Sequence, residues 1–487
     1  MKKIIASLSI LAIWGVFAED VSFPLDSGDI SNEENWNGEF PSSECTVKLD
    51  ENGPYSISKD LSVLGLIAHS SSPSITVSDG VKISIMNALR KDGLEFRANT
   101  VSGASLTGGF FHMVNGANCE MLFGRYEGST TPGATASLSS VTISNACYFT
   151  AVRHFSDAVL TVGERSRIYS QYGKISHSGA SSWCRGNTMN LVSGSEWHVS
   201  SILYFESEAN ENEDGLGGGS TLCVTGRDTL VSVDGGVVLG DVGCSNKLHV
   251  ADCARLESSK IEVGGQDSSN SSKGYGGNTV LFSNSATGRL NSVYLGMRPG
   301  GGGNVFAVAS NSHVTVYTMT VGNQDSGNVL VVDNAVLDVT SQLHVGSGKN
   351  AAGTDNTVIL RGRNPQIFNR NSSSQWVYAY NRSKFRFEVP EEGFADIPIK
   401  GSHFGWNGDV VLEVECKKFR KAGGGDIVLA EAGADTWVDQ NTDGNLAKCI
   451  VELNKKQPKG CSFEIKGKQI IYHASYLPPV GMRLVVR

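Results

Sequence analysis

Five stretches of the sequence share one spacing. Each has an Asn, apolar residues two, four, fifteen and seventeen positions later, and a Gly at position eighteen. The stretches begin at Asn145, Asn246, Asn278, Asn304 and Asn328. Repeats whose apolar residues alternate in pairs between Gly and Asn turns are typical of a β-solenoid, in which every copy is one coil that buries its face against its neighbours.

The Asn304 copy illustrates the pattern. Its apolar positions are Phe306, Val308, Met319 and Val321, and a third alternating stretch that includes Val314 and Val316 lies between the two pairs. This arrangement predicts three short strands per coil. Two degenerate copies fill the gaps in the series, one from Asn187 (Met189, Leu191, Ile202, Tyr204) and one from Ser220 (Leu222, Val224, Leu230).

The spacing of the copies indicates which solenoid to expect. From Ser220 onward the starts are 26, 32, 26, 24 and 28 residues apart, so the strict six-residue period of a left-handed hexapeptide solenoid is absent. We therefore predict an all-β fold, a right-handed parallel β-helix with β-rich caps at both ends. The Asn and Gly positions are interpreted structurally, because both residues tolerate left-handed backbone angles and stacked Asn side chains form ladders.

The N-terminal segment predicts export. Residues 1–18 combine Lys2 and Lys3 with an apolar run and a V-F-A site ending at Ala18, which is the pattern of a secretory signal peptide. No later segment is apolar over the length that a membrane-spanning helix needs. We expect an extracellular or cell-surface protein with no integral membrane segment in the mature chain. The predicted regions are the signal peptide (1–18), lead-in coils (19–118), repeats (119–363), and final coils with a cap (364–487).

Composition narrows the class of protein further. The chain has 57 Gly against 12 Pro, which favours an all-β exported protein. Its net charge of −8 is mild and its basic residues are scattered, so nucleic acid is not an expected partner. The ten cysteines allow two interpretations: free or stacked buried thiols, or local bridges such as Cys244–Cys253 and Cys449–Cys461.

Two segments resemble a known group of proteins. The stretch N-W-N-G-E-F-P from Asn35 to Pro41, followed by alternating apolar runs, resembles the start of bacterial secreted β-helix proteins, including those with autotransporter-associated β-strand repeats. The last hundred residues or so are similar to the closing segment of the same proteins. The resemblance implies a pectin-lyase-like architecture, a Trp36 that covers the open end of the first coil, and a passenger-like or adhesin-like function.

One motif suggests a metal. The sequence Asp439-Gln440-Asn441-Thr442-Asp443-Gly444 matches the first half of a calcium-binding loop, in which alternate oxygen ligands precede a Gly that makes the turn. Asp439, Asn441 and Asp443 are the candidate ligands for Ca²⁺. The twelfth position holds Ile450 in place of the usual bidentate Glu, so an ordinary turn between strands is the alternative.

No linear motif identifies catalytic residues, which stay unknown at this level. The chain lacks the Asp-Asp pair and the G-H-G sequence of polygalacturonase-like enzymes, and carboxylates in the repeats, such as Glu257, Glu262 and Asp338, are isolated. We expect a non-catalytic scaffold or adhesin-like protein that binds glycans or surface proteins, with no bound organic cofactor. The alternatives are a polysaccharide lyase or glycoside hydrolase, which a cleft holding carboxylates and an Arg or Lys would favour, and a fibre component.

Overall fold

A computed structural model describes residues 19–477 with internal gaps. The gaps are 38–39, 43–44, 51–52, 64, 69–73, 79–81, 86–93, 99–104, 108–109, 115–117, 126–134, 139, 152–158, 164–165, 178–187, 208–218, 242, 266–274, 347–352, 369–375, 381, 407–409, 434–437 and 440–445.

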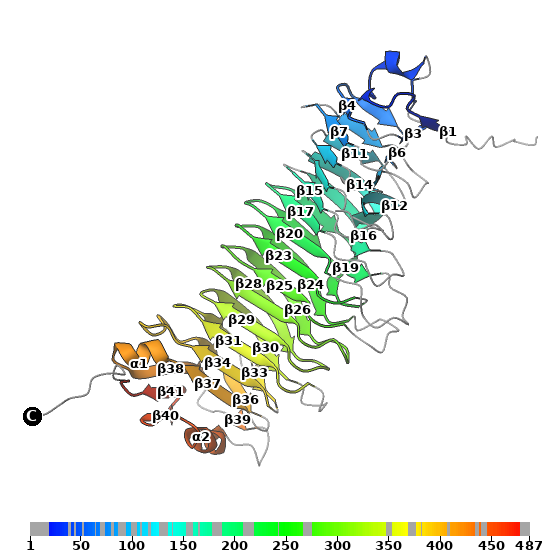
Figure 1. The fold of residues 1–487 in the computed structure, drawn as a ribbon. Helices are drawn as coiled ribbons and strands as arrows, with labels where there is room; N and C mark the ends of the chain where they lie inside the picture. The colour runs from blue at the N-terminus through cyan, green and yellow to red at the C-terminus, as the bar shows by residue number, and fades with distance from the viewer. Residues whose placement is uncertain are drawn as a thin grey trace, which may run out of the picture.

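The chain winds into a rod made of two stacked sheets (Figure 1). The first sheet contains fifteen described strands, one from each coil, all paired in parallel. They are β2 (Gly28–Asp29), β4 (Tyr55–Ile57), β7 (Ser74–Val77), β10 (Ser105–Thr107), β13 (Thr135–Leu138), β15 (Val159–Val162), β17 (Thr188–Val192), β20 (Thr221–Thr225), β23 (Lys247–Ala251), β25 (Thr279–Phe282), β27 (Val305–Ala309), β29 (Val329–Asp333), β31 (Thr357–Arg361), β34 (Lys384–Glu388) and β37 (Val411–Glu415).

The second sheet contains the other 26 described strands and covers the remaining sides of each coil. They are β1 (Glu19–Ser22), β3 (Cys45–Leu49), β5 (Leu61–Val63), β6 (Gly65–Ala68), β8 (Lys82–Ile85), β9 (Leu94–Ala98), β11 (Phe110–Val114), β12 (Asn118–Arg125), β14 (Ser140–Ala151), β16 (Arg167–His177), β18 (Glu196–Val199), β19 (Ile202–Ser207), β21 (Leu230–Val233), β22 (Gly236–Leu239), β24 (Arg255–Val263), β26 (Thr287–Leu295), β28 (His313–Val321), β30 (Val336–Val345), β32 (Gln366–Phe368), β33 (Trp376–Ala379), β35 (Ile399–Gly401), β36 (His403–Trp406), β38 (Gly425–Ala432), β39 (Val438–Asp439), β40 (Cys461–Lys466) and β41 (Gln469–Ala474). The parallel β-helix that the repeat predicts is thereby confirmed.

The number of strands per coil differs in part from the prediction. The coil from Ser220 has three, β20, β21 and β22, but in the coils that follow the second and third strands are continuous. β24, β26, β28 and β30 each run through a corner, and the pairing of β28 with β30 shifts register there, between Val316 and Thr318. The prediction of three short strands is therefore wrong for these coils, because the backbone bends at the corner without leaving the ladder.

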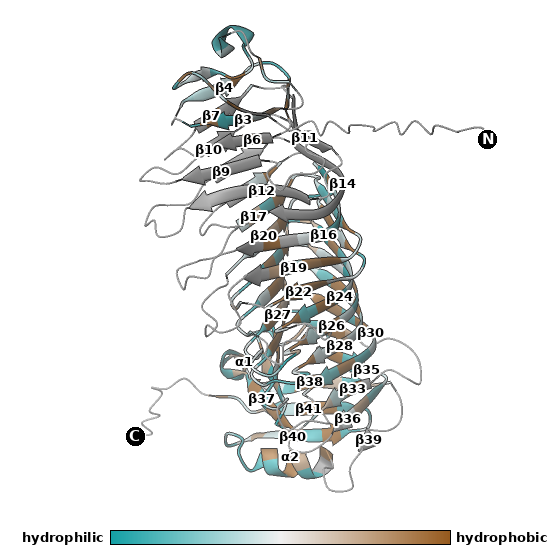
Figure 2. Cartoon of the chain, turned by 90° about the vertical axis from the view of Figure 1, so that its right-hand side faces the viewer, coloured by the Kyte–Doolittle hydropathy of each residue, from teal (hydrophilic) through white to brown (hydrophobic). Residues whose placement is uncertain are grey.

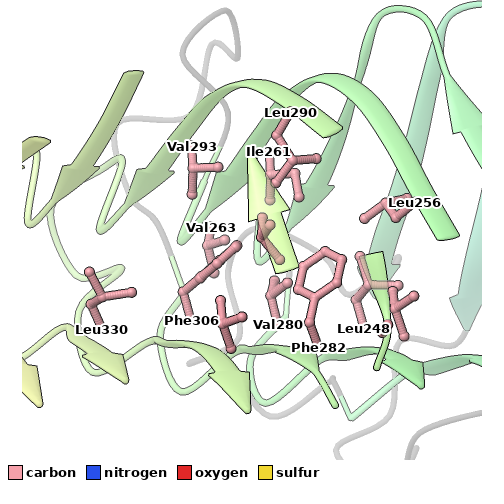
Figure 3. Close-up of a cluster of buried hydrophobic side chains, with 14 of the residues drawn as sticks. Leu248, Leu256, Ile261, Val263, Val280, Phe282, Leu290, Val293, Phe306 and Leu330 are labelled. Atoms are coloured by element: carbon pink, nitrogen blue, oxygen red, sulfur yellow. The ribbon is translucent and has the colours of Figure 1, made fainter. Parts of the chain in front are cut away.

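The apolar positions of the repeat form the core. In the Asn278, Asn304 and Asn328 copies all twelve predicted side chains are fully buried. Figure 3 shows the side chains of adjacent coils lying in rows, with Phe282 and Phe306 tilted against each other at a ring-centroid distance of 5.8 Å. In Figure 2 hydrophobic (brown) and hydrophilic (teal) positions are interspersed along the coloured strands of the rod. Inward side chains alternate with outward ones, as half-buried strands require.

In the two degenerate copies the structure buries different residues from those predicted. In the Asn187 copy Leu203 and Phe205 are buried in place of the predicted Ile202 and Tyr204, and in the Ser220 copy Val231 is buried in place of Leu230. One extra residue at a corner exchanges the inward and outward faces of a strand.

The Asn145 match is also out of phase with the others. Asn145 lies inside β14 of the second sheet, whereas the Asn246, Asn278, Asn304 and Asn328 positions directly precede strands of the first sheet.

The opening asparagines form a buried ladder along the rod. Asn246, Asn278, Asn304, Asn328 and Asn356 are fully buried. The Oδ1 of each accepts a hydrogen bond from the backbone N–H of the residue that opens the coil before it, at 2.9–3.2 Å, beginning with Ser220. From Asn246 onward the side-chain amide of each also donates to the Oδ1 of the next, at 2.9–3.1 Å. The predicted ladder is confirmed.

The closing glycines make room for this ladder. Gly264 has φ +85°, and a Cβ added there would lie 2.8 Å from Nδ2 of Asn304, which opens the second coil after it. A side chain at this position would therefore clash with the ladder as well as strain the backbone. The Asn and Gly positions of the repeat are thus coupled through space.

Both ends of the solenoid carry irregular elements. Near the first coil, Trp36 in the short helix η1 (Glu33–Trp36) is buried, donates from Nε1 to the Ile30 carbonyl at 2.7 Å, and packs edge-on against Phe23. At the other end, β41 pairs antiparallel with both β38 and β40. The contacts of Trp36 are compatible with the predicted cover of the first coil, and capping at both ends stays a prediction.

Two α-helices lie near the C-terminal end of the solenoid. α1 (Lys417–Ala422) is six residues long. α2 (Leu446–Asn454) was not predicted, although Leu446 and Ile450, one helical turn apart, are both buried. No described helix has the length and apolar character needed to cross a membrane.

Candidate binding groove

A groove follows the corner of the second sheet. Two adjoining hollows of about 230 Å³ and about 580 Å³ share Ser232 and Asp234. The smaller is lined by residues of β16, β18 and β21, and the larger by residues of β21, β24, β26, β28 and β30. With a strand spacing of about 4.8 Å, the six intervals between these seven strands correspond to about 29 Å along the rod axis.

Two rows of outward-facing residues line the larger hollow. The first row follows the strand register: Ser232 pairs with Glu257, Glu257 with Arg289, and Arg289 with Thr315. The second row lies two residues further along each strand, at the corner itself, and consists of Asp234, Ser259, Asn291 and Tyr317. Because each coil contributes one residue to each row, any ligand that lies in the groove contacts several coils at once.

The groove contains charges that the protein leaves exposed. Asp234 and Arg289 are exposed, and neither has an ion-pair partner among the residues that the structure describes. Glu257 is half-buried, and its Oε1 lies 3.4 Å from Nε of Arg255. Asp234 and Arg289 are therefore available to bind a ligand.

Aromatic side chains stand in the same groove. Tyr317 is 55% exposed and Tyr169 is 45% exposed. The Tyr169 ring stacks on His198, with centroids 5.0 Å apart and planes within 4°. His198 in turn lies 3.5 Å from Glu196, which also pairs with Arg167 at 3.2 Å. These contacts hold a flat aromatic surface near one end of the groove.

The combination of side chains favours recognition of a polyhydroxylated ligand. Ser, Thr and Asn side chains, together with Asp and Arg, donate and accept hydrogen bonds, and an exposed tyrosine offers apolar area with a polar tip. Within the described ranges, no group of three His, Cys, Asp or Glu is placed to hold a metal ion. Of the groove residues, the sequence singled out only Glu257. Outward positions carry no core pattern, and the available signal was their recurrence at one place in successive coils.

The predicted calcium ligands are only partly covered by the structure. The backbone of Asp439 belongs to β39 and pairs with Trp406, whereas Asn441 and Asp443 lie outside the described residues. The calcium site stays a prediction.

Of the other carboxylates singled out in the sequence, Asp338 continues the first row, because it pairs in register with Thr315, whereas Glu262 lies further along β24. Glu262 is fully buried, and its Oε1 lies 2.9 Å from Nζ of Lys260. Oδ1 of Asp338 is buried without a hydrogen-bond partner among the described residues.

Two histidines in the strands of the second sheet, His344 and His313, lie in different environments. His344 stacks on Tyr378 at 4.8 Å and is bonded to Gln342 at 2.9 Å, and burial lowers its pKa from 6.5 to about 4, whereas His313 is exposed. The imidazole of His344 is therefore neutral at physiological pH.

Cys45, Cys223, Cys253, Cys416 and Cys461 are free thiols. Neither of the suggested local pairs, Cys244–Cys253 and Cys449–Cys461, is bonded in the structure. Burial raises the pKa of Cys223 and of Cys416, which keeps both thiols protonated and poorly reactive.

Comparison with known proteins adds no relative. No family model, no curated protein and no solved structure matches the chain. The class defined by the fold is the parallel β-helix, and the resemblance to autotransporter-associated repeats gains no support from these comparisons.

Proposed function

We propose that this chain is an exported, non-catalytic β-helix that binds an extended glycan along the corner groove, outside the cell or at its surface. The observation that carries the proposal is the continuity of the groove across successive coils. A polymer with hydroxyl groups along its length meets a Ser, Thr or Asn side chain at nearly every coil, and Tyr317 provides a surface for a sugar ring.

A binding experiment tests this proposal. The purified exported chain is titrated with a panel of neutral and acidic polysaccharides by affinity electrophoresis and calorimetry. Tyr317→Ala and Asp234→Ala should each weaken binding by roughly tenfold, the effect of losing about 1.4 kcal/mol of contact. Tyr476→Ala, at an equally exposed tyrosine outside the groove, is the matched control and should bind like the parent protein. Absence of binding to every polysaccharide, or equal binding by all variants, contradicts the proposal.

The second candidate function is polysaccharide cleavage. It is favoured by the presence of Asp234, Glu257 and Arg289 in one groove, because lyases and hydrolases combine carboxylates with a cation. Incubation with the same panel distinguishes the two functions. Unsaturated products that absorb in the ultraviolet, or new reducing ends, that disappear in Glu257→Gln would replace the binding proposal with an enzyme.

A further inference from the structure

The mild overall charge conceals an asymmetry between the two ends of the solenoid. Residues 19–44 hold eight Asp and Glu and no Lys or Arg. Residues 416–487 hold twelve Lys and Arg against seven Asp and Glu. In the structure the first of these segments lies at one end of the rod, dark blue in Figure 1, and α1, β40, β41 and α2 lie at the other end.

The acidic end exposes carboxylates and apolar side chains together. Asp26, Glu33 and Glu34 are exposed, and none of the three has an ion-pair partner among the described residues. Leu25 and Phe40 are 40% and 37% exposed beside them. The nearest cations in the sequence, Lys48 and Lys59, belong to the coil that follows.

The opposite end presents the complementary features. α1 carries Lys417, Lys418, Arg420 and Lys421 and no acidic residue, and its three lysines are exposed without an ion-pair partner in the part of the chain that the structure describes. The exposed apolar side chains here are Val451 on α2, at 57%, and Tyr476, at 54%.

The exposed apolar side chains are also distributed between the two ends. Six large ones are exposed among the described residues: two stand in the groove, and the other four divide equally between the two ends. Each end thus combines a pair of exposed apolar side chains with an excess of charge of one sign, and the excess at the other end has the opposite sign.

From this complementarity we propose that the acidic end of one molecule binds the basic end of a second copy, head to tail. Such a contact is heterologous, because two different surfaces meet. A heterologous contact that does not close into a ring repeats indefinitely, so the predicted product is an open filament of rods. Coulomb attraction between exposed charges supplies the orientation and is weakened by salt, and the apolar side chains supply burial.

Sedimentation velocity and negative-stain electron microscopy test the contact. The purified exported chain should form end-to-end oligomers that grow with protein concentration at about 20 mM salt and dissociate at about 500 mM salt, where screening is strong. A chain that is monomeric at every concentration in low salt, or oligomers whose rods lie side by side, overturns the proposal.

Charge reversal provides the sharper experiment. The triple variant Asp26→Lys/Glu33→Lys/Glu34→Lys reverses the three exposed carboxylates named at the acidic end, and the triple variant Lys417→Glu/Lys418→Glu/Lys421→Glu reverses the exposed lysines of α1. Each variant alone opposes like charges at the contact and should stay monomeric. An equimolar mixture of the two should assemble again, because each acidic end then finds a basic one. Arg227→Glu, at an exposed mid-rod position, is the control and should assemble like the parent. Variants that assemble alone, or a folded mixture that does not assemble, refute the head-to-tail contact.

Discussion

Replacing Asn304 with Leu tests whether the asparagine ladder stabilises the solenoid. Leu matches Asn in branching and in the number of side-chain heavy atoms, although its methyl groups are larger than the amide atoms, and it removes every polar atom from the position. Oδ1 of Asn304 accepts from the backbone N–H and the side-chain amide of Asn278, at 3.0 and 2.9 Å. Its Nδ2 donates to Asn328 at 2.9 Å and to the carbonyl of Gly301.

The destabilisation caused by Asn304→Leu can be estimated from the hydrogen bonds that its neighbours keep and lose. The Asn278 amide keeps its bond to the Tyr275 carbonyl, and Oδ1 of Asn328 keeps its bond from the backbone N–H of residue 304. Two buried groups lose their hydrogen bonds to the Asn304 side chain: the backbone N–H of Asn278 and the carbonyl of Gly301. At about 1–3 kcal/mol for each buried unpaired group, the loss is about 4 kcal/mol. Burial of the leucine returns about 1–2 kcal/mol, which leaves a destabilisation of about 3 kcal/mol.

Hydrogen exchange measures this effect locally, which matters because long repeat arrays need not unfold in one step. A loss of about 3 kcal/mol corresponds to roughly hundredfold faster exchange of the amides in β25 and β27 when exchange follows local opening. The control is Asn291→Leu at an exposed groove position, for which the change should stay within about 0.5 kcal/mol. Equal exchange rates in the two variants would show that the ladder adds no stability and that the asparagines serve only the turn.

Three further predictions concern the core, the calcium loop and a buried histidine. Val332→Asp places an unpaired carboxylate between coils and should lower stability by several kcal/mol, seen as an earlier thermal transition in far-UV circular dichroism. If Asp443 binds Ca²⁺, adding calcium raises the melting temperature and Asp443→Ala abolishes the rise; an unchanged melt with and without chelator removes the site. For His344, burial lowers the pKa from 6.5 to about 4, so the stabilisation is complete above pH 6.5 and is lost as pH falls towards 4. The free energy of unfolding should fall by about 3 kcal/mol over this range. In His344→Phe the denaturation midpoint should lack this part of its pH dependence between pH 6.5 and 4.

The repeat predicts those parts of the fold that burial determines. Phe306 and Val332 follow from alternation, because only one face of each strand is inside, and the ladder follows from an amide that recurs beside a tight turn. The strand register failed at Ile202, where one additional corner residue exchanges the two faces without changing the composition of the segment.

The groove was beyond the reach of this reasoning. Asp234, Arg289 and Tyr317 face outward, so core packing places no constraint on their type. Only the bend that makes the strands of several coils turn together brings these side chains to one line. The type of a single outward residue does not show whether it binds a ligand or only faces solvent, and the one available signal is its recurrence at the same place in successive coils.

The ladder also gives the molecule a modular length. Asn278, Asn304 and Asn328 are equivalent, since each accepts from the coil before and donates to the coil after in one direction along the rod. Excision of residues 304–327 as a unit would bring Asn278 against Asn328 with the same hydrogen bonds, and duplication would insert one more identical step. The rod can therefore gain or lose whole coils without a new interface, and the reach of its groove changes in increments of about 4.8 Å.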